Sequence, residues 1–294
     1  MEKAVYHLPG LFEFYDFYRK FLPIYREKTE YFYDWCQIGS LYGAPADCLW
    51  AGGRVSNGNA NPRQVLALTE EYGLSARLTF SNSFLRPEHL KDPKCNRLCA
   101  LFGAESGNGV IVHSELLLAY LKEKYPNFYF VSSTTKVLTD FEDLAAETER
   151  PDFRYVVPDF RLNKAFDRLA GLKEKRKVEF LCNECCWPGC RERKACYENV
   201  SRKNLGEHCP DHVCAAPEGE KGYRFSAAMK NPAFIGIRDI RETYLPMGFS
   251  QFKIEGRGLG SAMLLEFILY YLTKPEYQLP LREEMYLDSM LDLF

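Results

Sequence analysis

Residues 178–190 read VEFLCNECCWPGC, a short apolar run that leads directly into closely spaced cysteines. Residues 178–181 have the length and composition of a buried strand. Thiols gathered this closely, in a chain that we expect to lack an export signal, indicate a metal or cluster site rather than disulfides. Most of the chain's 11 cysteines belong to this region: Cys182, Cys185, Cys186, Cys190, Cys196, Cys209 and Cys214.

The spacing of these cysteines distinguishes between kinds of site. Structural zinc sites typically use pairs of C-x2-C knuckles, and here only Cys182 and Cys185 have that spacing. Looser spacings, such as C-x4-C from Cys185 to Cys190, suit a [4Fe-4S] cluster, which needs four separated thiolates. An iron–sulfur cluster is therefore the preferred interpretation. Zinc, or thiols that bind no metal, are the alternatives.

Composition restricts the class of protein. The 294 residues allow one large α/β domain or two small ones, and 46% of them are hydrophobic, which is enough for a full core. A net charge of −2 does not indicate a generally basic, nucleic-acid-binding surface. The longest apolar stretch, 262–272, is too short to span a membrane and contains Glu266. We expect a reducing, cytoplasmic setting, in which the thiols stay reduced.

Strand-like and helical segments alternate along the chain after residues 1–33, which we interpret as a helical leader. Asn61 and Pro62 have the pattern of a helix start, with Asn as N-cap and Pro in the first turn. The expected strands are 36–41, 47–51, 77–80, 109–112, 128–131, 155–157, 178–181, 233–235 and 252–254. The expected helices are 62–72, 115–125, 140–148, 163–172, 238–244 and 261–272.

This alternation predicts a parallel sheet covered by helices. No helix fits between 36–41 and 47–51, so these two runs belong to one strand–helix unit and 178–181 belongs to the sixth. Eight such units favour a closed (β/α)8 TIM-type barrel over an open sheet, and no G-x-G-x-x-G follows the first strand. We therefore expect a single α/β domain over residues 1–294, with a cysteine-rich insertion at 182–214 after the sixth strand. The aromatic residues of 12–32 either pack on the core or provide a docking surface for a protein partner.

Active sites of such barrels lie at the carboxyl ends of the strands. Polar side chains follow several of the expected strands, and together they predict a polar mouth around a small-molecule cavity. His113 is interpreted either as a functional residue of this mouth or as a neutral histidine whose hydrogen bonds are satisfied within the protein. Arg257 would either bind an anion or form an ion pair with Glu255 or Glu266. The residues concerned are Asn82, His113, Ser133, Thr134, Asp159, Arg161, Asn163, Asn183, Glu184, Glu255 and Arg257.

Three motifs resemble the peptidase U32 family. They are LCNEC at 181–185 with Cys190-x-x-Arg193, NPAFIG at 231–236, and FKIEGR at 252–257. The resemblance implies a (β/α)8 barrel with a cysteine-bound [4Fe-4S] cluster. It also implies support of oxygen-independent hydroxylation, which in that family acts on RNA bases or ubiquinone precursors, with prephenate implicated as the hydroxyl source in some members.

The resemblance also implies roles for individual residues. Cys185 and Cys190 match the first two cluster positions, Cys196 stands where many relatives have His, and Cys214 or Cys209 completes the set. We take Cys185, Cys190, Cys196 and Cys214 as the predicted ligands. Glu184 and Glu255 are the predicted catalytic residues, and the predicted substrate-binding residues are Asn82, His113, Asp159, Asn183, Lys253 and Arg257.

This sequence departs from the family pattern in its spare thiols, Cys182 and Cys186, and in its short length. Both departures favour a small-molecule substrate over RNA. Two further functions are considered. One is a peptidase, although neither a Ser/His/Asp order nor an H-E-x-x-H helix is visible. The other is a non-catalytic scaffold that docks through its aromatic N-terminal segment.

Overall fold

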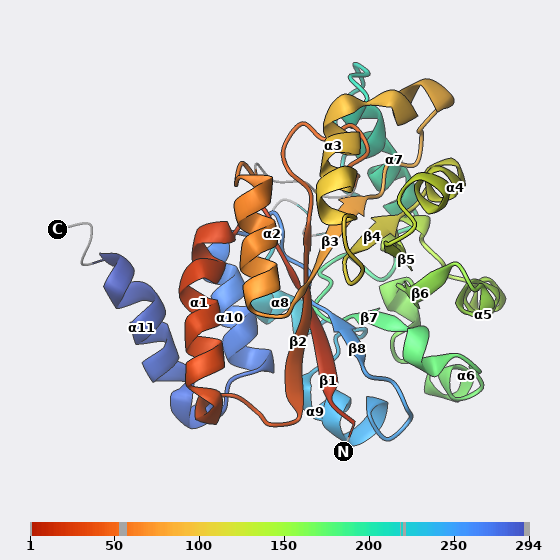
Figure 1. Ribbon diagram of the computed structural model, residues 1–294. Helices are drawn as coiled ribbons and strands as arrows, with labels where there is room; N and C mark the ends of the chain where they lie inside the picture. Colours follow the sequence, from red (N-terminus) through yellow and green to blue (C-terminus); the bar gives the residue numbers. More distant parts are fainter. Residues whose placement is uncertain (1, 53–57, 218, 220–221, 291–294) are drawn as a thin grey trace.

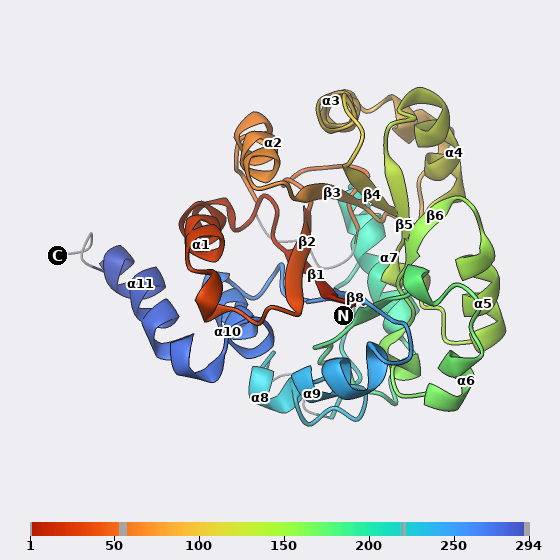
Figure 2. The same cartoon turned by 60° about the horizontal axis from the view of Figure 1, so that its bottom comes forward.

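The fold is a barrel of eight parallel strands. The computed structural model describes residues 2–52, 58–217, 219 and 222–290. The strand order is β6-β5-β4-β3-β2-β1-β8-β7, and a single parallel bridge between Val156 and Val178 joins the two ends of the sheet. Figure 2 shows the helices arranged around these strands. The predicted (β/α)8 barrel is confirmed. The strands are β1 (Ala4–Pro9), β2 (Cys36–Gly43), β3 (Ser75–Phe80), β4 (Gly109–Val112), β5 (Tyr129–Ser132), β6 (Phe153–Val156), β7 (Glu179–Leu181) and β8 (Gln251–Lys253).

Helices cover the outside of the barrel, and α1, α10 and α11 lie together on one side of it (Figure 1). The α-helices are α1 (Tyr15–Glu27), α2 (Pro62–Glu71), α3 (Pro93–Phe102), α4 (Glu115–Lys124), α5 (Phe141–Glu149), α6 (Phe166–Ala170), α7 (Arg193–Asn204), α8 (Phe225–Ala228), α9 (Ile237–Asp239), α10 (Ser261–Tyr271) and α11 (Gln278–Met290). Shorter turns are η1 (Thr29–Tyr31), η2 (Pro87–Lys91), η3 (Thr134–Lys136), η4 (Phe160–Leu162), η5 (Lys175–Lys177), η8 (Pro275–Tyr277) and the π-helical η7 (Ile240–Tyr244).

Local sequence explains where several helices begin. The Asn61 side chain accepts a hydrogen bond from Arg63 N at 2.9 Å, and Pro62 occupies the first turn of α2. Asp92 caps α3 in the same way, accepting from Cys95 N at 2.7 Å. These side chains satisfy amide groups that have no partner within the helix. The helix start predicted from Asn61 and Pro62 is therefore confirmed.

Three strand assignments from the sequence are wrong. Residues 4–9 are not part of a leader; they form β1, which pairs with both β2 and β8. Residues 47–51 and 233–235 form no strand. The reason is that strand pairing is a non-local property, and a short apolar run becomes a strand only where neighbours complete its hydrogen bonds. The cysteine-rich segment consequently follows the seventh strand, not the sixth.

The helical part of the leader prediction holds for α1, which contains Pro23 in its interior. The aromatic side chains of Phe14, which precedes the helix, and of Tyr18 and Phe21 within it are buried in the main core. The Tyr18 hydroxyl donates to Pro9 O at 2.6 Å, which ties the helix to the end of β1. These contacts correspond to core packing, the first of the two roles considered for the aromatic segment.

The barrel interior holds a small apolar cluster that is separate from the core between strands and helices. Tyr42, Ile111, Val131, Val157 and Leu181 form this cluster. Because alternate residues of a strand point to the same face, the residues two positions earlier on the same strands also point inward. On β2 and β7 these residues are Ser40 and Glu179. They form a buried polar layer nearer the amino ends of the strands, together with Arg77 from β3, Gln251 from β8 and His7 from β1.

Among the described residues, no helix has both the length and the apolar character that crossing a membrane requires.

Candidate functional site

A cavity of about 1000 Å³ opens at the carboxyl ends of the barrel strands. Inward-facing side chains form its floor, namely Tyr42, Thr79, Ile111, Leu181 and Lys253. These residues come from β2, β3, β4, β7 and β8, so the barrel itself holds the floor in place. Cavities of this size accommodate small organic molecules.

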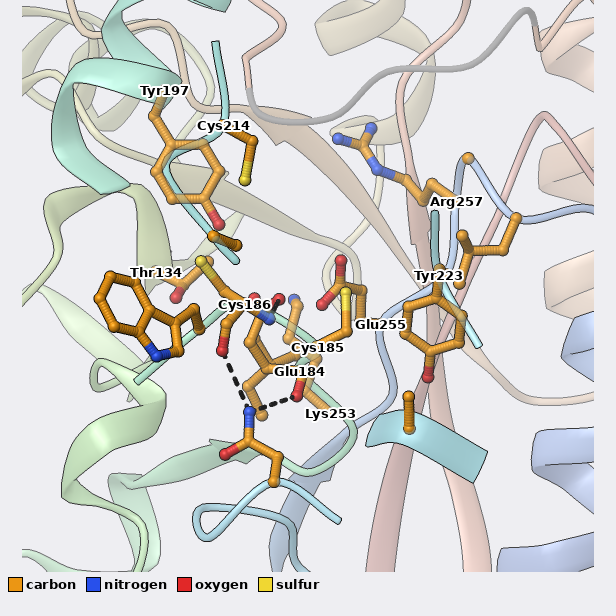
Figure 3. Close-up of a pocket in the computed structure, with 18 of the residues that line it drawn as sticks. Thr134, Glu184, Cys185, Cys186, Tyr197, Cys214, Tyr223, Lys253, Glu255 and Arg257 are labelled. Carbon is orange, nitrogen blue, oxygen red and sulfur yellow. Dashed lines mark hydrogen bonds between the residues drawn. The ribbon is translucent and has the colours of Figure 1, made fainter. Parts of the chain in front are cut away.

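The cysteine-rich segment forms one wall of this cavity. Cys185, Cys186 and Trp187 line it from the loop after β7, and Cys214 lines it from a later part of the segment. Figure 3 shows the three thiols around the same space as Lys253 and Glu255. Cys185 and Cys186 are half-buried, and Cys214 is exposed. The cavity therefore combines a polar floor with a wall that carries three thiols.

Glu184 anchors the loop that carries Cys185 and Cys186. Its Oε1 accepts from Cys186 N at 3.0 Å, and its Oε2 lies 2.6 Å from Arg193 Nη2. Asn231 Nδ2 adds hydrogen bonds to Glu184 O and Cys186 O, the dashed lines in Figure 3. Glu184 lines the cavity, but these contacts make it a positioning residue for the cysteine loop rather than a free acid or base.

Asp159 lies beneath the same loop. Its Oδ2 is 3.3 Å from Arg193 Nε, and its Oδ1 accepts from Arg161 Nε at 2.6 Å. Arg161 also donates to Cys190 O at 2.8 Å. Asp159 is fully buried and does not line the cavity. The structure thus places this predicted substrate-binding residue in the support of the cysteine loop.

Asn183 links the ends of β7 and β8. Its Oδ1 accepts from Glu255 N at 2.7 Å, and its Nδ2 donates to Glu255 O at 3.1 Å and to the Tyr223 hydroxyl at 3.3 Å. Asn183 is fully buried, whereas Glu255 and Tyr223 line the cavity. Asn183 therefore positions two cavity residues.

Lys253 lies on the cavity floor above the buried polar layer. Its Nζ is 3.3 Å from Glu179 Oε1 and 3.7 Å from the centre of the Tyr42 ring. Burial lowers the pKa of Lys253 from 10.5 to about 8, although Glu179 opposes the shift. A substantial fraction of this amine is therefore neutral near pH 8.

The layer below Lys253 contains more positive than negative charge. Arg77 Nη1 lies 2.6 Å from Glu179 Oε2. Burial alone would raise the pKa of Glu179, but Arg77 and Lys253 help to lower it well below its usual value, so Glu179 is ionised. Burial, and then Arg77, lowers the pKa of His7 to about 3, so His7 is neutral. One carboxylate therefore faces two cations.

Arg257 lies at the rim of the cavity and is mostly buried. Its Nη2 donates to Gly52 O at 3.2 Å, and its Nη1 is 3.8 Å from Glu13 Oε1. Burial raises the pKa of Glu13 and Arg257 opposes that shift, as expected for an ion pair. An ion-pair partner of Arg257 is thus Glu13, on the segment between β1 and α1. The sequence had suggested Glu255 or Glu266 as this partner.

His113 and Asn82, two further predicted substrate-binding residues, also lie off the cavity. His113 Nδ1 is 2.9 Å from Thr135 Oγ1, and burial, with Lys136, lowers the pKa of His113 to about 4. His113 is thus the neutral, hydrogen-bonded histidine of the alternative interpretation. Asn82 Nδ2 donates to Leu49 O and to Ser201 O on α7. Its role in this structure is to hold α7 over the end of β3.

The four predicted ligands do not share one location. Cys185 and Cys214 line the cavity, while Cys190 is buried and Cys196 lies on α7, both off the lining. Cys186, outside the predicted four, does line it. Over the described ranges, no group of three Cys, His, Asp or Glu side chains has the arrangement of a metal site. The donors facing the cavity are of the type that an iron–sulfur cluster uses, but they are not preassembled.

Comparison with solved structures identifies a related fold. A structure described as "The Structure of the U32 Peptidase Mk0906" aligns with a TM-score of 0.54, over 88% of this chain and 94% of that chain. The chain has the fold of a U32 peptidase. Sequence identity in this alignment is 14%, so the likeness is one of fold. No protein-family model matches the chain, and no curated protein matches it. The U32-like barrel agrees with the fold that the sequence motifs implied.

The sequence did not point to several residues of the cavity, among them Tyr42, Thr79 and Tyr223. Thr79 lies two residues after Arg77, so correct strand alternation on β3 would have placed both inside the barrel. Thr79 Oγ1 is buried and has no hydrogen-bond partner among the described residues. An unsatisfied hydroxyl on a cavity floor is a candidate contact for a bound molecule.

Proposed function

We propose that this protein performs or assists an oxygen-independent hydroxylation, or a related redox modification, of a small molecule, using a [4Fe-4S] cluster held by the cysteine-rich segment. The observation that carries the proposal is the position of Cys185, Cys186 and Cys214 on one cavity with Lys253. The U32-like fold and the FKIEGR motif at 252–257 support it.

Cys185, Cys186 and Cys214 would hold the cluster, and Cys190 or Cys196 would supply the fourth thiolate. Because these thiols are not preassembled, we propose that the loop after β7 and the segment around Cys214 close on the cluster as it binds. A bound cluster of this kind supplies electron transfer, or Lewis-acid activation at an open iron. The Glu184–Arg193 ion pair would fix the base of the loop during this closure.

The other cavity residues would bind and orient the substrate. Lys253 and Arg257 provide positive charge, and Glu255 provides a carboxylate on the same lining. Tyr42 and Leu181 provide apolar surface against which a small ring or chain can pack. Such a combination suits a small polar organic molecule better than a long peptide or a nucleic acid.

The test is anaerobic purification followed by iron and sulfide analysis and a visible absorption spectrum. We expect near-stoichiometric cluster and its loss when Cys185, Cys186 or Cys214 is replaced by Ser. The control is Cys36→Ser, because Cys36 lies in the core, where its thiol donates to Tyr271 O. Colourless protein with stoichiometric zinc would establish the zinc alternative. Iron content unchanged in all three cavity variants would contradict the proposed ligands.

A peptidase is the second candidate, because the solved structure with the related fold is described as a U32 peptidase. Cleavage of unstructured peptides that persists after iron removal would favour it. The scaffold hypothesis would be favoured by a heteromeric complex whose partner's rate does not change when Glu255 and Arg257 are replaced. The cytoplasmic setting is part of this proposal, because a reducing compartment keeps cluster-binding thiols available.

A further inference from the structure

Lys253 has the position of a reactive amine. It is the last residue of β8, at the carboxyl end of the barrel, and it lines the cavity floor. Its side chain is mostly buried, with 6% of its surface exposed, so water has little access to it. In barrels of this type the carboxyl ends of the strands carry the reacting groups.

The surroundings of Lys253 disfavour its charged form. Arg77 shares the carboxylate of Glu179 with Lys253, and the Arg77 contact, at 2.6 Å, is shorter than the Lys253 contact, at 3.3 Å. Arg257 adds a second positive charge that acts against protonation of Lys253, whereas the neutral His7 adds none. An amine that is mostly buried and partly neutral is a nucleophile rather than only a cation.

A hydrogen-bond donor for a bound oxygen lies on the same floor. Thr79 Oγ1 is buried and without a partner among the described residues, and it belongs to β3, whose inward face also carries Arg77. The face of the Tyr42 ring covers the Lys253 amine at 3.7 Å and provides an apolar surface beside it. A bound carbonyl compound would therefore meet both an amine and a hydroxyl group among the residues that line this cavity.

We propose that Lys253 forms an imine with a small aldehyde or ketone bound in the cavity. The neutral amine adds to the carbonyl carbon and gives a carbinolamine, with the amine proton passing to the oxygen. Loss of that oxygen as water then forms the carbon–nitrogen double bond, so no oxidant or reductant is required. Thr79 hydrogen-bonds the carbonyl oxygen as the amine adds. This inference goes beyond the proposed function and does not depend on a cluster.

The test uses the full chain, with propanal as a neutral probe and pyruvate as an anionic one, each with cyanoborohydride to reduce any imine to a stable amine. Peptide mapping by mass spectrometry locates the label. The internal reference is Lys173, which is exposed and whose pKa is raised by Glu149. We expect Lys253 to be labelled at least about tenfold faster than Lys173 near pH 7, because more of its amine is neutral.

Two variants complete the experiment. Thr79→Val should slow the labelling of Lys253 and leave that of Lys173 unchanged. Lys253→Arg keeps the cation near Glu179, cannot form an imine, and should lose the fast label. Failure of both probes to label Lys253 in the folded protein, or labelling no faster than at Lys173, would overturn the proposal. The measurement is made with and without bound iron, so its outcome is separate from that of the cluster analysis.

Discussion

The side-chain amide of Asn183 hydrogen-bonds both main-chain groups of Glu255, at 2.7 Å to its N and 3.1 Å to its O. The strands β7 and β8 end at Leu181 and Lys253, so this amide continues their pairing beyond the sheet. The cysteine loop begins directly after Asn183, and Glu255 lines the cavity. This single side chain therefore connects the two walls of the candidate site.

Replacement of Asn183 by Ala should lower the free energy of unfolding by about 1–3 kcal/mol, because it leaves buried main-chain groups of Glu255 without partners. Urea denaturation measures this loss. Asn59→Ala, at an exposed position, is the matched control and should change stability little. Equal stability of the two variants would show that the Asn183 contacts contribute nothing.

The Glu184–Arg193 pair should show strong coupling in a double-mutant cycle. Both side chains are about 2% exposed and their charged atoms lie 2.6 Å apart. Glu184→Gln and Arg193→Gln should each cost about 3–5 kcal/mol, since each removes one partner of a buried ion pair. The double variant should cost less than the sum. The exposed Arg238–Glu242 pair, replaced in the same way, should show a coupling energy of less than about 0.5 kcal/mol. Additive effects at Glu184 and Arg193 would contradict the proposed coupling of this ion pair.

Glu179→Gln should destabilise the barrel by about 3–5 kcal/mol, because Arg77 and Lys253 would then share no carboxylate in a buried layer. Thermal or urea unfolding measures the effect. Glu149→Gln is the control, because its pair with Lys173 is largely exposed. A loss no larger than that of the control would mean that the buried layer tolerates two unpaired cations.

Acid should destabilise the protein partly through His113. Its pKa is about 4 in the folded chain and near 6.5 when exposed, so between these values the unfolded chain binds a proton that the folded chain does not. Stability therefore falls as the pH is lowered. His113→Gln should reduce the stability difference between pH 7 and pH 5 by on the order of 2 kcal/mol. An unchanged pH dependence in this variant would show that His113 is protonated in the folded protein.

The barrel should open most easily at the β6–β7 seam. One bridge, Val156 with Val178, joins these strands, whereas β1 pairs with β2 over six residues and also with β8. Hydrogen exchange followed by mass spectrometry should show faster exchange in peptides covering β6 and β7 than in those covering β1 and β2. Protection as strong at the seam as at β1 would contradict this expectation.

Part of the site was accessible from the sequence because its residues follow strand ends. Glu184, Glu255, Lys253 and Arg257 were expected in the site and do line the cavity. Asn82, Asp159 and His113 also follow strand ends, but they contact neighbouring loops instead. A position in the sequence cannot indicate which way a side chain points at a strand end, because that depends on the partners that the loops bring to it.

The order of the residues alone was enough to predict the local features of this protein: the helix start at Asn61, the alternation of strands and helices, and the crowding of thiols after Leu181. These depend on residues within a few positions of one another, where backbone geometry and capping act directly. The tertiary structure alone decided that Ala4–Pro9 is a barrel strand, that Cys186 rather than Cys190 faces the cavity, and that Arg77 meets Glu179 from 102 positions away. Those outcomes depend on strand pairing and burial between distant segments, which exist only once the barrel has formed.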